Sequence, residues 1–168
     1  MAIFSFLSAI LLHESGHMFA LLLYRAKIIN VRLSPFGMTI THSALPSEIA
    51  TFTVAAFGPL FGIIGFFAEQ CSGTLPFFSL FSLVLSLFNL LPIKTLDGSR
   101  MTEALLSRFL PPNTATCVAE LLSHIFLFLL WLFGIFLFFF LDESPSLFFM
   151  SLALFFQGVK DEESLKIE

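Results

Sequence analysis

Charged residues are scarce in this chain. They make up 12% of the 168 residues, whereas an ordinary soluble domain carries about 25%. Hydrophobic residues make up 57%, and 25 residues are Phe. This composition excludes an ordinary soluble domain and predicts an all-α polytopic membrane protein. The chain also has no Gly-rich phosphate loop and no basic stripe, so nucleic acid is not an expected partner.

The chain has few cysteines, and basic residues are absent from its first stretch. Cys71 and Cys117 are the two cysteines, and they fall in connections predicted below to lie on opposite sides of the membrane. We therefore expect neither a disulfide nor a cysteine-type zinc cluster. The first stretch, from Met1 to Leu12, has no Lys or Arg, whereas a signal peptide begins with a basic region. The first apolar segment is expected to stay in place.

Long apolar segments are what the chain does have. A membrane-spanning helix needs about 20 mostly apolar residues. About five segments qualify, although the last is short for a span and would need a small tilt or a locally thin bilayer. These predicted spans are 2–23, 49–68, 75–92, 119–141 and 145–158.

The basic residues predict an orientation. Lys and Arg occur in the connections 24–48 and 93–118 and in the tail, and none occurs in the short connections 70–74 and 142–145. Under the positive-inside rule, the N-terminus lies outside and the C-terminus lies in the cytoplasm.

Two connections look structured. Residues 28–41 favour strands around a turn, which predicts a small cytoplasmic-side β-hairpin or a membrane-dipping loop. Leu96–Leu110 is predicted to form a short interfacial helix that ends at the following Pro-Pro pair. We interpret 1–168 as a single membrane-embedded domain, with no PDZ domain and no nucleotide-sensing domain.

The first span contains a metal-binding motif. His13 and His17 are about 40° and 6 Å apart on a helix, so both imidazoles can reach one ion. Glu14 stands beside the first ligand and can take a proton from a metal-bound water. This HExxH pattern is typical of zinc metalloproteases, and ionisable residues inside a membrane are functional candidates.

A third ligand must come from elsewhere, because catalytic zinc typically has three protein ligands and an open fourth position. The metzincin pattern is excluded, since it would need His at position 23, which is Leu23,. Asp97 is the favoured third ligand, although an Asp before Gly98 can also be a plain helix cap. Glu103 is the next candidate, and Glu48, Glu120, His42 and His124 stay open.

Two motifs together resemble a known family. The HExxH segment 13–17 and the segment 89–98, NLLPIKTLDG, are similar to the two motifs of the site-2 protease family of intramembrane zinc proteases. The resemblance runs from about Leu7 to Leu110. The segment 34–37, SPFG, also resembles the bacterial sporulation branch, typified by the stage IV sporulation protein FB.

The resemblance implies roles for individual residues. It implies that His13, His17 and Asp97 bind one Zn²⁺ per chain. It also implies that Glu14 is the general base and that Asn89 hydrogen-bonds the substrate backbone or the developing oxyanion.

The resemblance further implies an intramembrane zinc endopeptidase in a bacterial cell or forespore membrane. Its substrate would be a membrane-tethered protein, such as a sigma-factor precursor or an anti-sigma factor, held in extended form by the edge of the hairpin. A homo-oligomer or a regulatory membrane partner stays open. The sporulation branch has a span before the HExxH helix, which is not found here.

Two other functions stay open from the sequence. One is a protease that clears leftover signal peptides. The other is a noncatalytic metal-binding or metal-permeation protein, which would need polar groups at several depths of the bilayer. The segments 119–141 and 145–158 are almost purely apolar, and this speaks against permeation.

Overall fold

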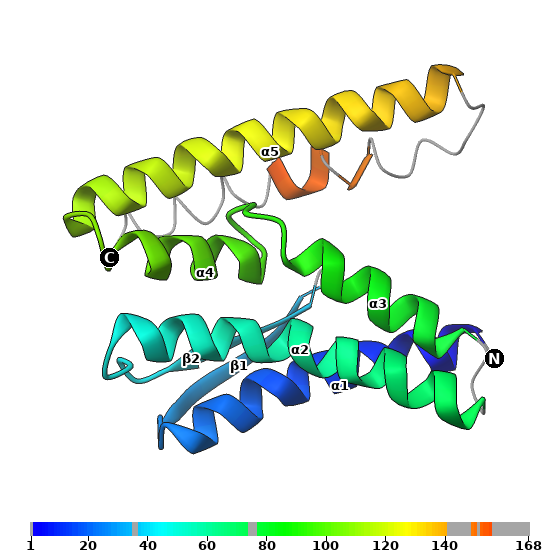
Figure 1. Ribbon diagram of the computed structural model, residues 1–168, viewed down its shortest axis with the longest axis horizontal. Helices are drawn as coiled ribbons and strands as arrows, with labels where there is room; N and C mark the ends of the chain where they lie inside the picture. The colour runs from blue at the N-terminus through cyan, green and yellow to red at the C-terminus, as the bar shows by residue number, and fades with distance from the viewer. Residues whose placement is uncertain (1, 35–36, 74–76, 141–148, 151, 156–168) are drawn as a thin grey trace.

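A computed structural model describes residues 2–34, 37–73, 77–140, 149–150 and 152–155 (Figure 1). In this part of the chain, three helices are long and apolar enough to cross a membrane. They are α1 (Ala2–Leu23), α2 (Glu48–Ser72) and α5 (Pro112–Phe140). They correspond to the first, second and fourth predicted spans, so the all-α membrane fold class is confirmed.

Local capping defines the ends of α1 and α2. After α1, Arg25 adopts a left-handed conformation with φ 52°, and the Ala26 amide donates to the Leu21 carbonyl. The Ser47 hydroxyl accepts the Ala50 amide hydrogen at the start of α2. Gly73 ends α2 with φ 62°, a conformation that favours glycine,.

Helix α2 extends beyond the predicted end at residue 68. A carboxyl group is costly in an apolar span. In the structure Glu69 is buried and accepts a hydrogen bond from the Ser72 hydroxyl at 2.9 Å. The helix continues because this local bond helps to satisfy the carboxyl group.

Helix α5 likewise begins earlier than the predicted residue 119. We read the Pro-Pro pair as a stop, but Pro112 is the first residue of α5. Proline is well suited to the first turn of a helix, where its missing amide hydrogen costs nothing.

The third predicted span, 75–92, contains a shorter helix in the described part of the chain. Helix α3 (Phe78–Asn89) has 12 residues, which makes it about 18 Å long. A hydrocarbon core of about 30 Å therefore exceeds its length. Pro92 cannot donate the amide hydrogen that would continue the helix. The predicted span 145–158 lies largely outside the described residues.

The two structured connections have regular elements. Strands β1 (Ile28–Ser34) and β2 (Gly37–His42) pair antiparallel, with Val31 opposite Ile40. Helix α4 (Asp97–Leu106) corresponds to the predicted short helix.

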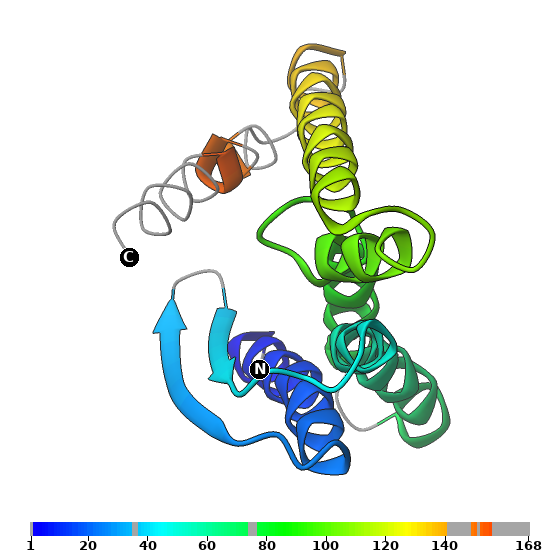
Figure 2. The same ribbon diagram turned by 90° about the vertical axis from the view of Figure 1, so that its left-hand side faces the viewer.

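Small residues bring the first three apolar helices together. A Cβ atom on Gly16 of α1 would lie closer than 3.0 Å to the backbone of Phe57 in α2. Such close backbone approach is typical of helix pairs in membranes. Ser82 of α3 donates to the Gly62 carbonyl of α2 at 2.8 Å. Viewed end-on, α1 and the hairpin lie on one side and α5 leads away from the other helices (Figure 2).

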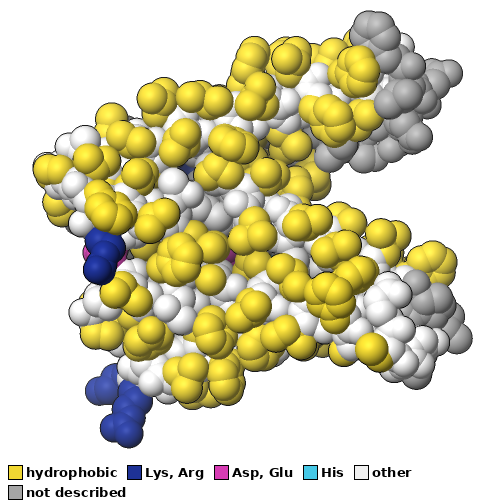
Figure 3. Space-filling view, in the orientation of Figure 1, with side chains coloured by type: hydrophobic (Ala, Val, Ile, Leu, Met, Phe, Trp, Pro, Cys, Tyr) yellow, Lys and Arg dark blue, Asp and Glu magenta, His cyan; other side chains and the backbone are white. Residues whose placement is uncertain are grey.

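Apolar side chains cover most of the visible surface, and Lys and Arg gather at one end (Figure 3). At that end α1 and α4 finish and α2 and α5 begin (Figure 1). The exposed Arg25 and Lys27 follow α1, and the exposed Arg108 follows α4. This asymmetry matches the charge pattern that we read from the sequence.

Candidate metal centre

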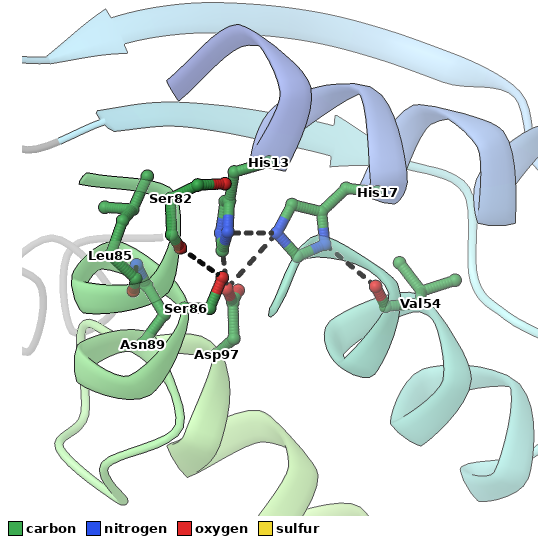
Figure 4. Close-up of polar contacts among 8 residues, drawn as sticks. All are labelled: His13, His17, Val54, Ser82, Leu85, Ser86, Asn89 and Asp97. Carbon is green, nitrogen blue, oxygen red and sulfur yellow. Dashed lines mark hydrogen bonds and ion pairs between the residues drawn. The ribbon is translucent and has the colours of Figure 1, made fainter. Parts of the chain in front are cut away.

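Helices α1 and α4 bring three ligand-type side chains together (Figure 4). His13 and His17 come from successive turns of α1, and Asp97 is the first residue of α4. His13 is buried, and the other two side chains are mostly buried. The predicted ligand set therefore converges, although 84 positions separate His13 from Asp97.

The spacing of the ligand atoms fits a tetrahedral zinc ion. Asp97 Oδ2 lies 3.0 Å from His13 Nε2 and 3.2 Å from His17 Nε2, and the two Nε2 atoms are 3.4 Å apart. Around tetrahedral zinc with bonds of about 2.0–2.1 Å, neighbouring ligand atoms lie about 3.3 Å apart. Two imidazoles and a carboxylate are also a donor set that zinc favours.

The backbone of α2 orients one of the histidines. His17 Nδ1 lies 2.8 Å from the Val54 carbonyl oxygen. A carbonyl can only accept, so Nδ1 carries the hydrogen and donates it. In the neutral ring this leaves the Nε2 lone pair directed at Asp97 and His13. Metal-binding histidines are commonly oriented in this way by their second nitrogen.

A close backbone approach positions Asp97. A Cβ atom on Gly98 would lie closer than 3.0 Å to the carbonyl oxygens of Leu90 and Leu91. Glycine at this position therefore lets the start of α4 fold back against the end of α3. Burial raises the pKa of Asp97, but its contacts with His13 and His17 outweigh burial and bring the pKa to about 2. The carboxylate is thus held in the charged form that binds metal.

The remaining predicted site residues lie nearby. Glu14 follows His13 on α1 and is half-buried. Asn89 is the last residue of α3, and its Nδ2 donates to the Leu85 carbonyl at 2.9 Å. An amide nitrogen carries two hydrogens, so this bond still allows a second one. The roles of Glu14 as base and Asn89 as an oxyanion donor stay predictions.

The alternative candidates for the third ligand make contacts away from His13 and His17. Glu103 accepts a hydrogen bond from Thr116 at 2.8 Å, and Glu120 pairs with Lys94 at 3.2 Å. His124 Nδ1 donates to the backbone carbonyl of Glu120 at 2.7 Å. Among the described residues, the group of side chains arranged to hold a metal is His13, His17 and Asp97.

Two further alternatives lie on α2 and β2. Glu48 is the first residue of α2 and is exposed. His42 ends β2, and its side chain lies outside the described part of the chain.

Sequence reasoning missed the contribution of the Val54 carbonyl. A backbone group leaves no mark in the residue types, so HExxH could not indicate it. Pro59 does not indicate it either, because a proline at 59 leaves the Ala55 carbonyl, and not the Val54 carbonyl, without its amide donor,.

Comparisons with known proteins show what this chain is similar to. Residues 53–133 match the model of the family described as Peptidase family M50. The chain is 29% identical to zinc metalloprotease MJ0392 from Methanocaldococcus jannaschii, over 95% of this chain and 49% of that protein. The chain thus spans about half the length of this curated relative.

A solved structure shows the same fold. The site-2 protease from Methanocaldococcus jannaschii matches with a TM-score of 0.69 and 24% identity, over 94% of this chain and 75% of that one. Over residues 53–133 the chain is similar to peptidase family M50, and its fold is similar to that of a site-2 protease. The His13, His17 and Asp97 cluster could hold a metal ion, and its donor atoms fit zinc,. The sporulation branch is not confirmed by these relatives and stays a prediction.

Proposed function

We propose that this protein is an intramembrane zinc endopeptidase that hydrolyses peptide bonds of membrane-embedded or membrane-tethered proteins. The observation that carries the proposal is the meeting of His13, His17 and Asp97 among apolar helices. Burying three such groups in a membrane protein is costly unless they serve a purpose.

The chemistry divides among the ligands and their neighbours. When bound, zinc lowers the pKa of a water molecule towards about 7 and polarises the scissile carbonyl. His13, His17 and Asp97 hold the metal. Glu14 accepts the proton of the attacking water and delivers it to the leaving amine. Asn89 donates a hydrogen bond to the substrate backbone or to the developing oxyanion.

The substrate must present an extended backbone, because a helix hides its own peptide bonds. A hairpin has free edges that can pair with such a segment by strand addition. The β1–β2 hairpin lies beside α1, which carries the two histidines (Figures 1 and 2). We therefore propose that the hairpin edge holds an extended substrate segment. The resemblance to site-2 proteases supports a membrane-tethered regulatory protein as the substrate class, with a sigma-factor precursor or an anti-sigma factor as the leading example.

The substitution Glu14→Gln tests the proposal. Glutamine keeps the size of the side chain but cannot accept the proton, so cleavage of a membrane-tethered substrate should fall by at least about 100-fold. Zinc content should stay at one per chain, as measured by elemental analysis of detergent-purified protein.

The matched control is Glu103→Gln, because Glu103 is outside the metal cluster and bonds Thr116. This variant should retain both zinc and cleavage. Retained turnover in Glu14→Gln would exclude Glu14 as the base. Zinc binding without cleavage of regulatory substrates or of leftover signal peptides, across a broad screen, would favour a noncatalytic metal-binding protein.

A further inference from the structure

The imidazole of His17 is confined by one turn of α2. On one side, its Nδ1 donates to the Val54 carbonyl at 2.8 Å. On the other side, the ring lies against Gly58. A Cβ atom on Gly58 would come closer than 3.0 Å to two atoms of the His17 ring, Nε2 and Cε1. Real Cβ atoms essentially never show such separations.

The same position also borders the other histidine. A Cβ atom on Gly58 would lie 2.9 Å from His13 Nε2. Gly58 therefore faces both metal-binding nitrogens, from a helix that supplies no ligand side chain. A side chain there would occupy the space in which the two nitrogens and Asp97 meet.

Two backbone features of α2 hold the His17 ring. The Val54 carbonyl accepts the hydrogen of Nδ1, and Gly58, about one helical turn further along, presents a bare Cα to the ring. Pro59 leaves the Ala55 carbonyl, and not the Val54 carbonyl, without its amide donor, so it does not account for this contact,.

We propose that Gly58 is a positioning residue for the metal site: its missing side chain creates the space in which the His17 imidazole, anchored by the Val54 carbonyl, presents Nε2 to the metal. The inference rests on the proposed function, since it assigns a role in binding the same zinc. If the ring moved to relieve an added methyl group, it would lose either the Val54 hydrogen bond or the alignment of Nε2.

The test compares Gly58→Ala with Gly65→Ala in the full-length, detergent-purified chain. Gly65 lies two turns further along α2, and a Cβ there would meet chiefly the flexible end of Leu12. Both variants add one methyl group to α2, but only Gly58→Ala places it against the metal-binding nitrogens of His13 and His17.

The primary readout is the zinc dissociation constant, measured by competition with a chromophoric chelator. Gly58→Ala should weaken zinc binding by about 10-fold or more, the size of effect seen when the groups orienting a ligand are altered. Gly65→Ala should bind zinc as the unaltered chain does. The increase in Tm on adding zinc should shrink in Gly58→Ala, because stabilisation by a ligand follows its affinity.

The outcomes separate the two proposals. Equal zinc affinity in Gly58→Ala and the unaltered chain would overturn the positioning role and leave the proposed function standing. Absence of zinc binding by the unaltered chain would overturn the proposed function and this inference with it.

A second measurement needs no substitution and tests the His17 geometry on which the inference depends, even if Gly58→Ala fails to fold. The chain has four histidines, so ¹⁵N NMR of the imidazole nitrogens in the zinc-loaded protein is tractable. His17 should carry its hydrogen on Nδ1 and bind zinc through Nε2. Coordination through Nδ1 would overturn the inference.

Discussion

At the scale of single residues, the site depends on a carboxylate that the fold brings to two histidines. Asp97 Oδ2 is within 3.2 Å of both Nε2 atoms. The alternatives Glu103 and Glu120 bond Thr116 and Lys94 instead. Asp97 is therefore the predicted third ligand, and this prediction can be tested directly.

We predict that Asp97→Asn weakens zinc binding by more than about 10-fold, because the charged ligand becomes a neutral and poorer donor. The measurement is zinc affinity of the purified variant, together with its zinc-induced rise in Tm. Glu103→Gln is the control and should bind zinc normally. Unchanged affinity in Asp97→Asn would mean that another residue completes the site.

At the scale of helices, small residues decide how closely the apolar elements pack. Gly62 of α2 lies against Ser86 of α3, and a Cβ on Gly62 would come closer than 3.0 Å to the Ser86 hydroxyl oxygen. That hydroxyl donates to the Ser82 carbonyl at 2.7 Å, inside a fully buried contact. Because α3 leads into the loop before Asp97, this contact supports the position of the metal ligand.

We predict that Gly62→Ala lowers the free energy of unfolding by about 1–3 kcal/mol, the usual effect of overpacking. Ser86→Ala removes the clashing oxygen, so the double variant should recover most of this loss. The measurement is a double-mutant cycle by denaturant unfolding in detergent, with an expected coupling energy of about 0.5–3 kcal/mol.

Simple additivity of the two substitutions would contradict the predicted contact. Gly65→Ala serves as the control, since the flexible Leu12 side chain can yield to the added methyl group.

At the scale of the whole molecule, the exposed surface and the distribution of charge indicate how the protein sits in a bilayer. Many exposed side chains of α5 are large and apolar, including Phe128, Phe133 and Phe139. Such a surface suits lipid tails. Lys and Arg gather at one end of the molecule (Figure 3), and the positive-inside rule predicts that this end faces the cytoplasm.

The two native cysteines test this orientation. Cys71 lies at the end of α2 and Cys117 near the start of α5, and both are free and exposed. We predict that a membrane-impermeant thiol reagent labels Cys71 in intact cells and labels Cys117 only after permeabilisation. Single-cysteine forms, made with Cys71→Ser and Cys117→Ser, identify the labelled site. Labelling of Cys117 alone in intact cells would invert the topology.

The sequence by itself determined the local features. The apolar character of α1, α2 and α5 depends on composition, and the pairing of His13 with His17 depends on helical periodicity; both are properties of neighbouring residues. The ends of segments were less predictable, because Glu69 and Pro112 are compatible with a helix only when their surroundings satisfy them.

Only the tertiary structure decided which acid joins the two histidines and which groups hold them. From the sequence, Asp97 is one of several candidates. In the structure, α3 ends at Asn89 and the start of α4 packs closely against the following residues at Gly98, which places Asp97 beside the histidines. The Val54 carbonyl and the space at Gly58 are properties of helix crossing rather than of residue type. The physical reason is that contacts between distant segments depend on how closely backbones can approach, and local sequence patterns do not contain that information.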